Sequence, residues 1–397
     1  MDPIRNPYSP GAGSPPHALA GRDHLREQVR VAIARIRRGN SAKSILMVGL
    51  RGVGKTVLLD RMRADAEAVG VHTIRIEAPE NRSLPALLAP QVRLALLRLS
   101  HLDAAKEMAQ RGLRALAGFV GSLKIKYQDI EVGLDLAPEP GLADNGDLEG
   151  DLGSLLQQVG QAALNGSTAV VIFIDELQYL QEDQFGALIS ALHRCAQNKL
   201  PITVVGAGLP QLRGLAGSAK SYAERLFDFP TIGPLKHEEA ELAILKPARD
   251  EGEDFTPEAV IEIISQTRGY PYFLQEWGKH SWDVAEYSPI SLDNVVAASK
   301  EAIAALDESF FRVRFDRLTP AEKKYLRAMA DLGEGPHRSG VVAEELQKSV
   351  SSLGPVRQTL ITKGMIWSPS HGDTAFTVPL FDEFMKRIMP GPDWKSG

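Results

Sequence analysis

The chain has 397 residues, of which 44% are hydrophobic and 24% are charged, and its formal net charge is −5. This composition is typical of a soluble globular protein of two or three domains, and it carries no global basic field. Any contact with DNA would therefore have to be local. No run approaches the roughly 18 apolar residues of a membrane span, so no membrane partner is predicted. The single cysteine, Cys195, cannot form an internal disulfide and suits the cytoplasm, where we expect a buried helix residue.

The first two thirds of the chain alternate apolar runs with helical patterns. Residues 1–16 are rich in Pro, Gly and Ser, and we expect a flexible arm there. Short apolar runs bounded by turn residues predict buried parallel strands, and apolar residues at helical spacing predict helices. Strands are expected over 44–50, 71–78, 168–177 and 201–208. Helices are expected over 19–38, 56–70, 84–116, 152–164 and 183–199.

An insertion is expected over residues 117–150, between elements of the sheet. Apolar residues alternate in two bursts over 122–136, which predicts a β-hairpin. The acidic, Pro- and Gly-rich residues that follow predict an exposed loop. From about residue 235 the pattern becomes helical, and the last segment reads as three helices followed by two short strands.

The stretch "GLRGVGKT" fits the pattern G-x-x-x-x-G-K-[ST] and lies between an expected strand and an expected helix. Its glycines let main-chain N–H groups close around phosphate oxygens, and the helix presents its positive end to the same anion. Lys55 can neutralise the β- and γ-phosphates and so take part in catalysis, and the Thr56 hydroxyl can bind Mg²⁺. The predicted nucleotide-binding segment comprises Gly49, Gly52, Val53, Gly54, Lys55, Thr56 and Val57.

Two acids end the apolar strand "VVIFIDE". Asp175 is predicted to hold Mg²⁺ through water, and Glu176 to orient or deprotonate the attacking water. The alternative is that these acids merely end a strand at the surface. An adjacent Asp-Glu pair favours hydrolysis over transfer to a small acceptor, so a small-molecule kinase fits poorly.

With both motifs in place, the chain resembles AAA+ ATPases of the origin-recognition and initiator-like branch, with features of STAND signalling ATPases. "LAGRDHLREQV" is similar to the segment near the nucleotide base, with Gly21 and Arg22 on its Gly-Arg pair. "SYAERLFDF" resembles the stretch that carries an arginine finger at subunit interfaces, here Arg225. "RGYPYFLQ" resembles the Gly-x-Pro motif of STAND lids, with Gly269 and Pro271 at the matching positions; in the family this motif packs against the nucleotide.

The resemblance implies an α/β fold: a P-loop AAA+ core with a parallel sheet, a helical lid and a C-terminal winged-helix domain. The expected boundaries are 1–16 for the arm, 17–234 for the core, 235–312 for the lid and 313–397 for the winged helix. The implied ligands are ATP or ADP with Mg²⁺, and Arg225 implies a homo-oligomer. The alternative for Arg225 is a surface arginine paired with Glu224 or Glu241.

Two departures from the family pattern concern catalysis. The sensor-1 strand "VVGAGLPQL" ends in Gly206-Ala207-Gly208, without the usual polar residue. Tyr272 stands where initiator relatives place a sensor-2 arginine. Both differences remove stabilisation of the transition state, so the resemblance implies a slow ATPase that acts as a switch.

The predicted winged helix leaves its partner open. Over residues 317–397 the chain has 11 Lys and Arg against 9 Asp and Glu, a net charge of +2, which is a weak footprint for DNA. One interpretation is an ATP-gated, DNA-associated regulator, and the other is a STAND-type switch that acts through a protein partner. The positions expected to face bases or phosphates are Ser351, Ser352, Arg357, Gln358 and Thr362.

Overall fold

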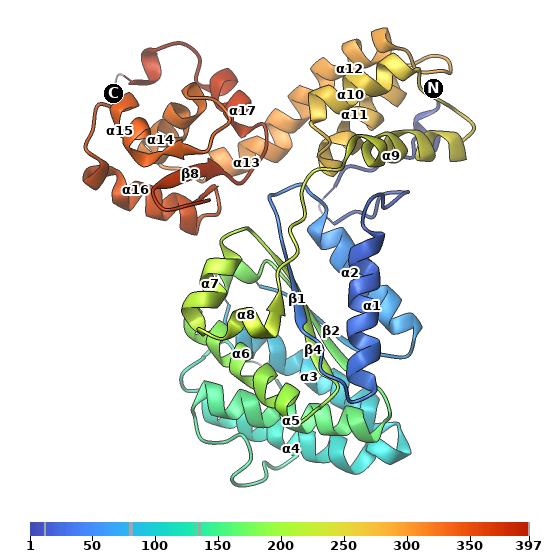
Figure 1. Cartoon of the computed structure of the whole chain (residues 1–397), viewed down its shortest axis with the longest axis vertical. Helices are drawn as coiled ribbons and strands as arrows, with labels where there is room; N and C mark the ends of the chain where they lie inside the picture. Colours follow the sequence, from blue (N-terminus) through green and yellow to red (C-terminus); the bar gives the residue numbers. More distant parts are fainter. Residues whose placement is uncertain (12, 79–81, 131, 134–135, 396–397) are drawn as a thin grey trace. The chain divides into compact units, whose positions relative to one another are not determined.

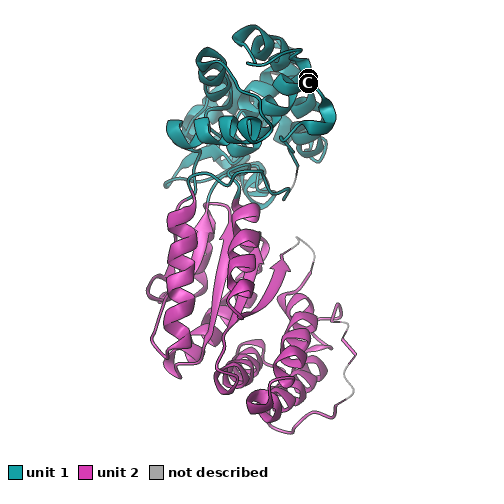
Figure 2. Cartoon of the chain, turned by 90° about the vertical axis from the view of Figure 1, so that its right-hand side faces the viewer, with its two compact units in different colours: residues 1–21, 49–54, 232–397 teal, residues 22–48, 55–231 magenta. Residues whose placement is uncertain are grey.

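A computed structural model describes residues 1–11, 13–78, 82–130, 132–133 and 136–395 of the chain. These residues form two compact units, which Figure 2 colours separately. The sheet unit consists of residues 22–48 and 55–231, and the helical unit consists of residues 1–21, 49–54 and 232–397. Each unit is described by itself.

The sheet unit contains a five-stranded parallel sheet with the strand order β2-β3-β4-β1-β5 (Figure 1). The strands are β1 (Ser44–Val48), β2 (His72–Glu77), β3 (Val170–Asp175), β4 (Ile202–Gly208) and β5 (Phe227–Asp228). The helical segments are α1 (Asp23–Arg37), α2 (Lys55–Ala68), α3 (Leu84–Ser100), η2 (Asp103–Ala105), α4 (Lys106–Leu123), α5 (Leu148–Asn165), η3 (Leu177–Tyr179), α6 (Glu182–Gln197), α7 (Leu212–Ala219) and α8 (Ala223–Leu226).

Both faces of the sheet are covered, and this explains why its strands are apolar at successive positions. Every residue of β1, β3 and β4 is buried. Leu46, Ile172 and Val204 belong to one large apolar core with residues of α3, α5 and α6. Helices α1 and α2 pack on each other, and α2 also packs on β3 and β4. The α/β fold and the strands and helices predicted for this unit are thus confirmed, except over 84–150.

Between residues 84 and 150, one prediction is refined and one is wrong. The expected helical region 84–116 is helical and consists of α3, the short η2 and the first part of α4. No strand forms among the described residues of 122–136; residues 131, 134 and 135 lie outside the description. The buried residues here are Leu123, Tyr127 and Ile130, whereas Ile125 is 88% exposed. Leu123, Tyr127 and Ile130 are four and three residues apart, whereas a strand would bury every second residue. The alternating pattern in the sequence therefore came from the end of α4 and the turns after it.

The helical unit consists mainly of helices. They are η1 (Pro3–Arg5), α9 (His237–Asp250), α10 (Pro257–Thr267), α11 (Pro271–Val284), α12 (Leu292–Ala305), the π-helical η4 (Leu306–Phe311), α13 (Arg312–Phe315), α14 (Pro320–Asp331), α15 (Ser339–Glu345), α16 (Val350–Thr362), α17 (Phe381–Ile388) and η5 (Asp393–Lys395). Its strands β6 (His337–Arg338), β8 (Asp373–Phe376) and β7 (Ile366–Trp367) pair antiparallel in that order.

The C-terminal part of this unit contains the predicted succession of three helices and two strands. These are α14, α15, α16, β7 and β8, to which the structure adds the short strand β6 and helix α17. Helix α14 begins with the capping box expected of Thr319 and Glu322, whose side chains each accept from the other's backbone N–H. The aromatic residues Phe311, Phe381 and Phe384 pack on one another, so α17 adds to the core of this part.

The N-terminal segment is not a free arm, which corrects the prediction for residues 1–16. Tyr8 is 3% exposed, and its hydroxyl donates to the carbonyl of Ile244 in α9. The indole of Trp282 in α11 donates to the carbonyl of Asp2 at 2.9 Å, and Asn6 donates to the carbonyl of Lys279 at 3.0 Å. Aromatic and amide side chains among the prolines therefore fix this segment to α9 and α11; residue 12 lies outside the description.

In the part of the chain that the structure describes, no helix has the length and apolar character needed to cross a bilayer. Cys195 lies on α6 and is fully buried, as expected for a packing residue.

Candidate nucleotide site

The predicted motifs follow two strands of the same parallel sheet, β1 and β3. The phosphate loop follows β1, the acid pair ends β3, and β4 lies between these two strands. Because the strands are parallel, their carboxyl ends meet at one edge of the sheet, which is where open α/β sheets bind ligands. This topology supports the sequence prediction that one site uses both motifs.

The phosphate loop has the backbone conformation that its glycines allow. Gly52 and Gly54 have φ values of 79° and 86°, in the left-handed region that favours glycine. Helix α2 begins at Lys55, so the N–H groups of its first turn lack partners within the helix. Lys55 is 7% exposed, and Val53 is 1% exposed. A buried ammonium beside a helix N-terminus suits a multiply charged anion.

The acid pair lies in a sharp turn at the end of β3. Asp175 is 2% exposed, and its Oδ1 accepts the N–H of Glu176 at 2.9 Å. Glu176 has a φ of 53°, which non-glycine residues adopt rarely and which is common at functional sites. This turn separates the two carboxylates: Asp175 stays buried at the strand end, and Glu176 is partly exposed.

Arg75 was not identified from the sequence, although it forms an ion pair with Asp175. Its guanidinium lies 3.4 Å from Asp175 Oδ2 and donates to Asp60 Oδ1 of α2 at 2.8 Å. A buried carboxylate is costly unless it is paired, and Arg75 supplies that pairing. The available signal was a single arginine in the apolar strand pattern "TIRIE".

Gln178 was also missed, and it lies directly against Glu176. Its amide Nε2 donates to Glu176 Oε2, and its Oε1 accepts the N–H of Leu209 at 3.0 Å, just beyond β4. Glycine at position 208 makes room for it, because a Cβ there would lie 2.8 Å from Gln178 Oε1. The sequence signals were the glycines of β4 and a polar residue two positions after Glu176.

In the helical unit, the predicted lid motif contacts the phosphate loop. The backbone N–H of Tyr272 donates to the carbonyl of Gly52 at 3.2 Å. Pro271 is the first residue of α11, and Gly269 accepts the N–H of Leu235 at 2.8 Å. Burial, together with the negative charge of Glu276, raises the pKa of Tyr272 to about 12, so it is a neutral phenol at physiological pH. Tyr272 therefore cannot supply the positive charge of an arginine at this position.

A second contact joins the phosphate loop to the C-terminal part of the same unit. The backbone N–H of Arg51 donates to the carbonyl of Thr377, just after β8, at 3.0 Å. Main-chain N–H groups of such loops are the groups expected to hold phosphates. One of them is thus bonded to the C-terminal part of the helical unit.

Gly21 and Arg22, which are predicted to lie near the nucleotide base, are at the start of α1, and Arg225 lies on α8. Gly21 has a φ of 70°, and Arg22 is the buried N-cap residue of α1. Arg225 is exposed, and among the described residues no ion pair joins it to Glu224 or Glu241. This exposure leaves Arg225 available to a second copy.

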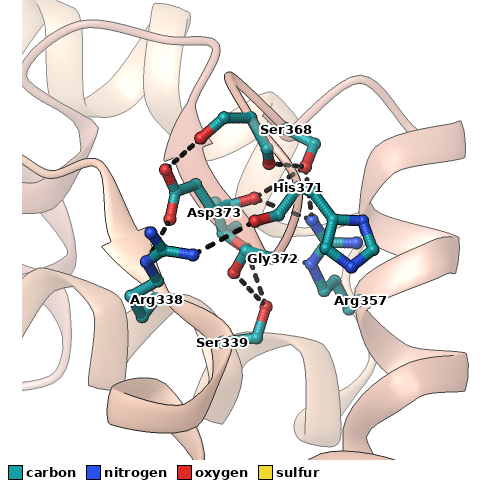
Figure 3. A network of polar contacts seen from close by, with 9 residues as sticks. Arg338, Ser339, Arg357, Ser368, His371, Gly372 and Asp373 are labelled. Carbon is teal, nitrogen blue, oxygen red and sulfur yellow. Dashed lines mark hydrogen bonds and ion pairs between the residues drawn. The ribbon is translucent and has the colours of Figure 1, made fainter.

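Arg357 does not face outward from α16, which corrects its predicted role. Its guanidinium donates to the carbonyl of Asp373 at 2.8 Å, to Thr374 Oγ1 at 2.9 Å and to Ser368 Oγ at 2.9 Å (Figure 3). Arg338 secures the same β7–β8 turn through Asp373 at 3.1 Å and the carbonyl of His371 at 3.2 Å. The other predicted positions, Ser351, Ser352, Gln358 and Thr362, are exposed.

A phosphate loop after the first strand and an acid pair after another strand of the same parallel sheet, one strand away, define a P-loop ATPase fold. In agreement, residues 18–205 match the family "AAA ATPase domain", and residues 308–385 match "Domain of unknown function (DUF8462)". The predicted resemblance to AAA-type ATPases is thus confirmed, and the family match lies over residues 18–205.

Similarity to individual proteins is weaker. The chain is 25% identical over 214 residues to an uncharacterized HTH-type transcriptional regulator of Methanocaldococcus jannaschii and spans about half of that protein's length. A Walker-type ATPase of Pyrococcus abyssi superposes with a TM-score of 0.56 at 15% identity, over 93% of this chain and 96% of that one. The Aeropyrum pernix Orc1 protein, solved in complex with DNA, gives a TM-score of 0.48 at 14% identity, over 94% of both chains. At 15% identity, the likeness to the P. abyssi ATPase shows the fold alone.

Proposed function

We propose that this protein is an ATP-gated switch that binds and slowly hydrolyses ATP and passes its nucleotide state to the C-terminal part of the helical unit. The observation that carries the proposal is the pair of hydrogen bonds on the phosphate loop. Tyr272 of α11 bonds Gly52, and Thr377 bonds the N–H of Arg51. A nucleotide phosphate would compete for loop N–H groups, so binding would alter the contact with Thr377.

The residues of the sheet unit suit the chemistry of hydrolysis. Lys55 and the N-terminus of α2 would hold the phosphates, and Glu176 would take a proton from the attacking water. The Thr56 hydroxyl and the buried Asp175 carboxylate are hard oxygen donors, and Mg²⁺ in such sites takes few protein ligands besides phosphate and water. They therefore fit Mg²⁺, which when bound would neutralise charge on the transferring phosphate.

A low rate of turnover follows from two features of the site. Strand β4 ends in glycine and alanine, and Tyr272 is neutral where a sensor arginine is expected. Each removes an electrostatic contribution of about 3 kcal/mol to stabilising the transition state. Turnover of purified monomer at tens per second would contradict a switch of this kind.

The first test is nucleotide binding by the Lys55→Ala variant. Fluorescent ATP should bind the wild type in the presence of Mg²⁺ and should bind the variant at least about a hundredfold more weakly. Lys106→Ala is the matched control, because Lys106 is an exposed lysine that also begins a helix. Equal binding by wild type and Lys55→Ala would refute the proposed site.

The coupling is tested by hydrogen exchange of the peptide that covers residues 364–380. With a non-hydrolysable ATP analogue, its exchange should differ from that with ADP, since the Arg51–Thr377 bond is made in one state and released in the other. Identical exchange in both states would contradict the coupling, even if ATP binds.

For the partner, we propose DNA, with support from the HTH-type name of the M. jannaschii relative. Anisotropy with a labelled duplex should then show binding at about 50 mM salt that weakens steeply as salt is added. A protein partner is the second candidate, favoured by α16 itself. Its only charged residue is Arg357, and that side chain is occupied by the β7–β8 turn. Absence of duplex binding at low salt would favour the protein partner.

Self-association through Arg225 is part of the same proposal. If Arg225 completes the site of a second copy, specific activity should rise with protein concentration. Mixing Arg225→Ala with Lys55→Ala should then restore activity, because each variant supplies what the other lacks. Specific activity that is constant over a wide range of protein concentration would exclude a role for Arg225 in the site of a second copy.

A further inference from the structure

We infer that Gln178 positions Glu176 for the attack of water and replaces, from a different element, the polar residue that β4 lacks. The inference rests on the proposed ATPase function. All the residues that carry it lie in the sheet unit: Glu176, Gln178, Gly206, Gly208 and Leu209.

The amide of Gln178 connects two fixed points. Its Oε1 accepts the N–H of Leu209 at 3.0 Å, and its Nε2 donates to Glu176 Oε2. The orientation of the amide follows from chemistry, because a backbone N–H can only donate and a carboxylate can only accept. An amide can therefore bond both Glu176 and the N–H of Leu209, whereas a carboxylate at position 178 would repel the like charge of Glu176.

The backbone confines both residues. Glu176 is in the left-handed conformation with a φ of 53°, and Gln178 follows in the short helix η3. These conformations turn the two side chains toward each other across a single residue. A carboxylate so restrained loses little orientational freedom when a water molecule binds, which is how positioning groups raise reaction rates.

The glycines of β4 accommodate this arrangement. A Cβ on Gly208 would lie 2.8 Å from Gln178 Oε1, and a Cβ on Gly206 would lie 2.2 Å from Leu177 Cδ1. A side chain at position 208 would push on the amide of Gln178, and one at position 206 would push on the side chain of Leu177. The absence of a polar side chain from the C-terminal end of β4, Gly206-Ala207-Gly208, is thus the condition for Gln178 to occupy the space beside the strand end.

In the reaction, the water oxygen bonds to the γ-phosphorus, and the bond from phosphorus to the β–γ bridging oxygen breaks with its electron pair leaving on ADP. The water proton passes to Glu176. Gln178 touches neither water nor phosphate in this scheme; it acts by holding Glu176, so it is a positioning residue.

The test is Gln178→Met, which keeps the side-chain volume and removes both hydrogen bonds. We expect kcat to fall about tenfold or more, as for loss of a hydrogen bond to a charged group, while the Kd for ATP stays within about twofold. Gln197→Met is the matched control, because Gln197 is exposed at the end of α6. Gly208→Ala should lower kcat independently by pushing on Gln178.

A double-mutant cycle separates positioning from a structural role. In a Glu176→Ala background, Gln178→Met should have no further effect on turnover, because its contribution acts through the missing carboxylate. Unchanged kcat in Gln178→Met, or a full tenfold loss in the Glu176→Ala background, would overturn the inference. Failure of the wild type to bind ATP in a Lys55-dependent way would instead refute the proposed function.

Discussion

Two regions were predicted to meet phosphate, the edge of the parallel sheet and the outer face of α16, and in the second the structure corrects the predicted role of one residue, Arg357. At the sheet edge, the phosphate loop and the acids follow β1 and β3 with the expected backbone geometry. On α16, Arg357 turns back and bonds the β7–β8 turn. A motif that depends on backbone conformation can be predicted from the local sequence. The direction of a long surface side chain depends on neighbours that the local sequence does not show.

The strongest way to break the first half of this comparison is Glu176→Gln. The substitution keeps the shape of the side chain and removes the proton acceptor, so hydrolysis should fall by about a hundredfold to a thousandfold. ATP binding should be retained, because Lys55 and the loop backbone remain. Single-turnover hydrolysis and fluorescent ATP binding check the two effects separately. Loss of binding together with turnover would mean that Glu176 supports the fold of the site instead.

Arg75 sharpens the comparison within the sheet unit. Arg75→Met leaves the 2%-exposed Asp175 without its cation, so the free energy of unfolding without Mg²⁺ should fall by about 1–3 kcal/mol. Mg²⁺·ATP should stabilise the variant more than the wild type, because the metal no longer competes with an arginine for Asp175. Urea denaturation with and without Mg²⁺·ATP measures both terms.

The control for Arg75 is Arg30→Met on α1, where the side chain is 63% exposed and pairs only locally with Glu27. That variant should unfold like the wild type in both conditions. If the two variants respond equally to Mg²⁺·ATP, Arg75 and the metal do not share Asp175.

Arg357 tests the second half of the comparison. Arg357→Met should lower the stability of the C-terminal part by about 1–3 kcal/mol, since it removes three hydrogen bonds to the β7–β8 turn. Gln358→Ala, at an exposed neighbouring position, should leave stability unchanged and should affect only partner binding. Hydrogen exchange over residues 366–376 distinguishes these results. A variant that loses DNA binding while the turn stays protected would restore Arg357 as a phosphate contact.

The sequence was sufficient to predict the features that depend on the periodicity of apolar residues and on the pattern of glycines. It predicted strands β1 to β4, most of the helices that flank them and the acid pair at the end of β3, but not the short strand β5. It did not predict Arg75 or Gln178, because each acts through contacts with residues distant in sequence, such as Asp175 and Leu209. It also misjudged the first 16 residues, since proline and glycine content suggested mobility while Tyr8 and Asn6 were the residues that made contacts.

The smallest expected effect concerns Cys195, a position that helical periodicity predicted to be buried. Burial raises the pKa of its thiol to about 12, because the thiolate would lose its hydration inside α6's packing face. A raised pKa keeps the thiol protonated, so a thiol reagent such as iodoacetamide should not modify the folded protein up to about pH 9. Mass spectrometry should detect modification only after denaturation. Rapid labelling of the native protein would show that α6 opens locally. Helical periodicity would then be a poorer guide to burial than we argue.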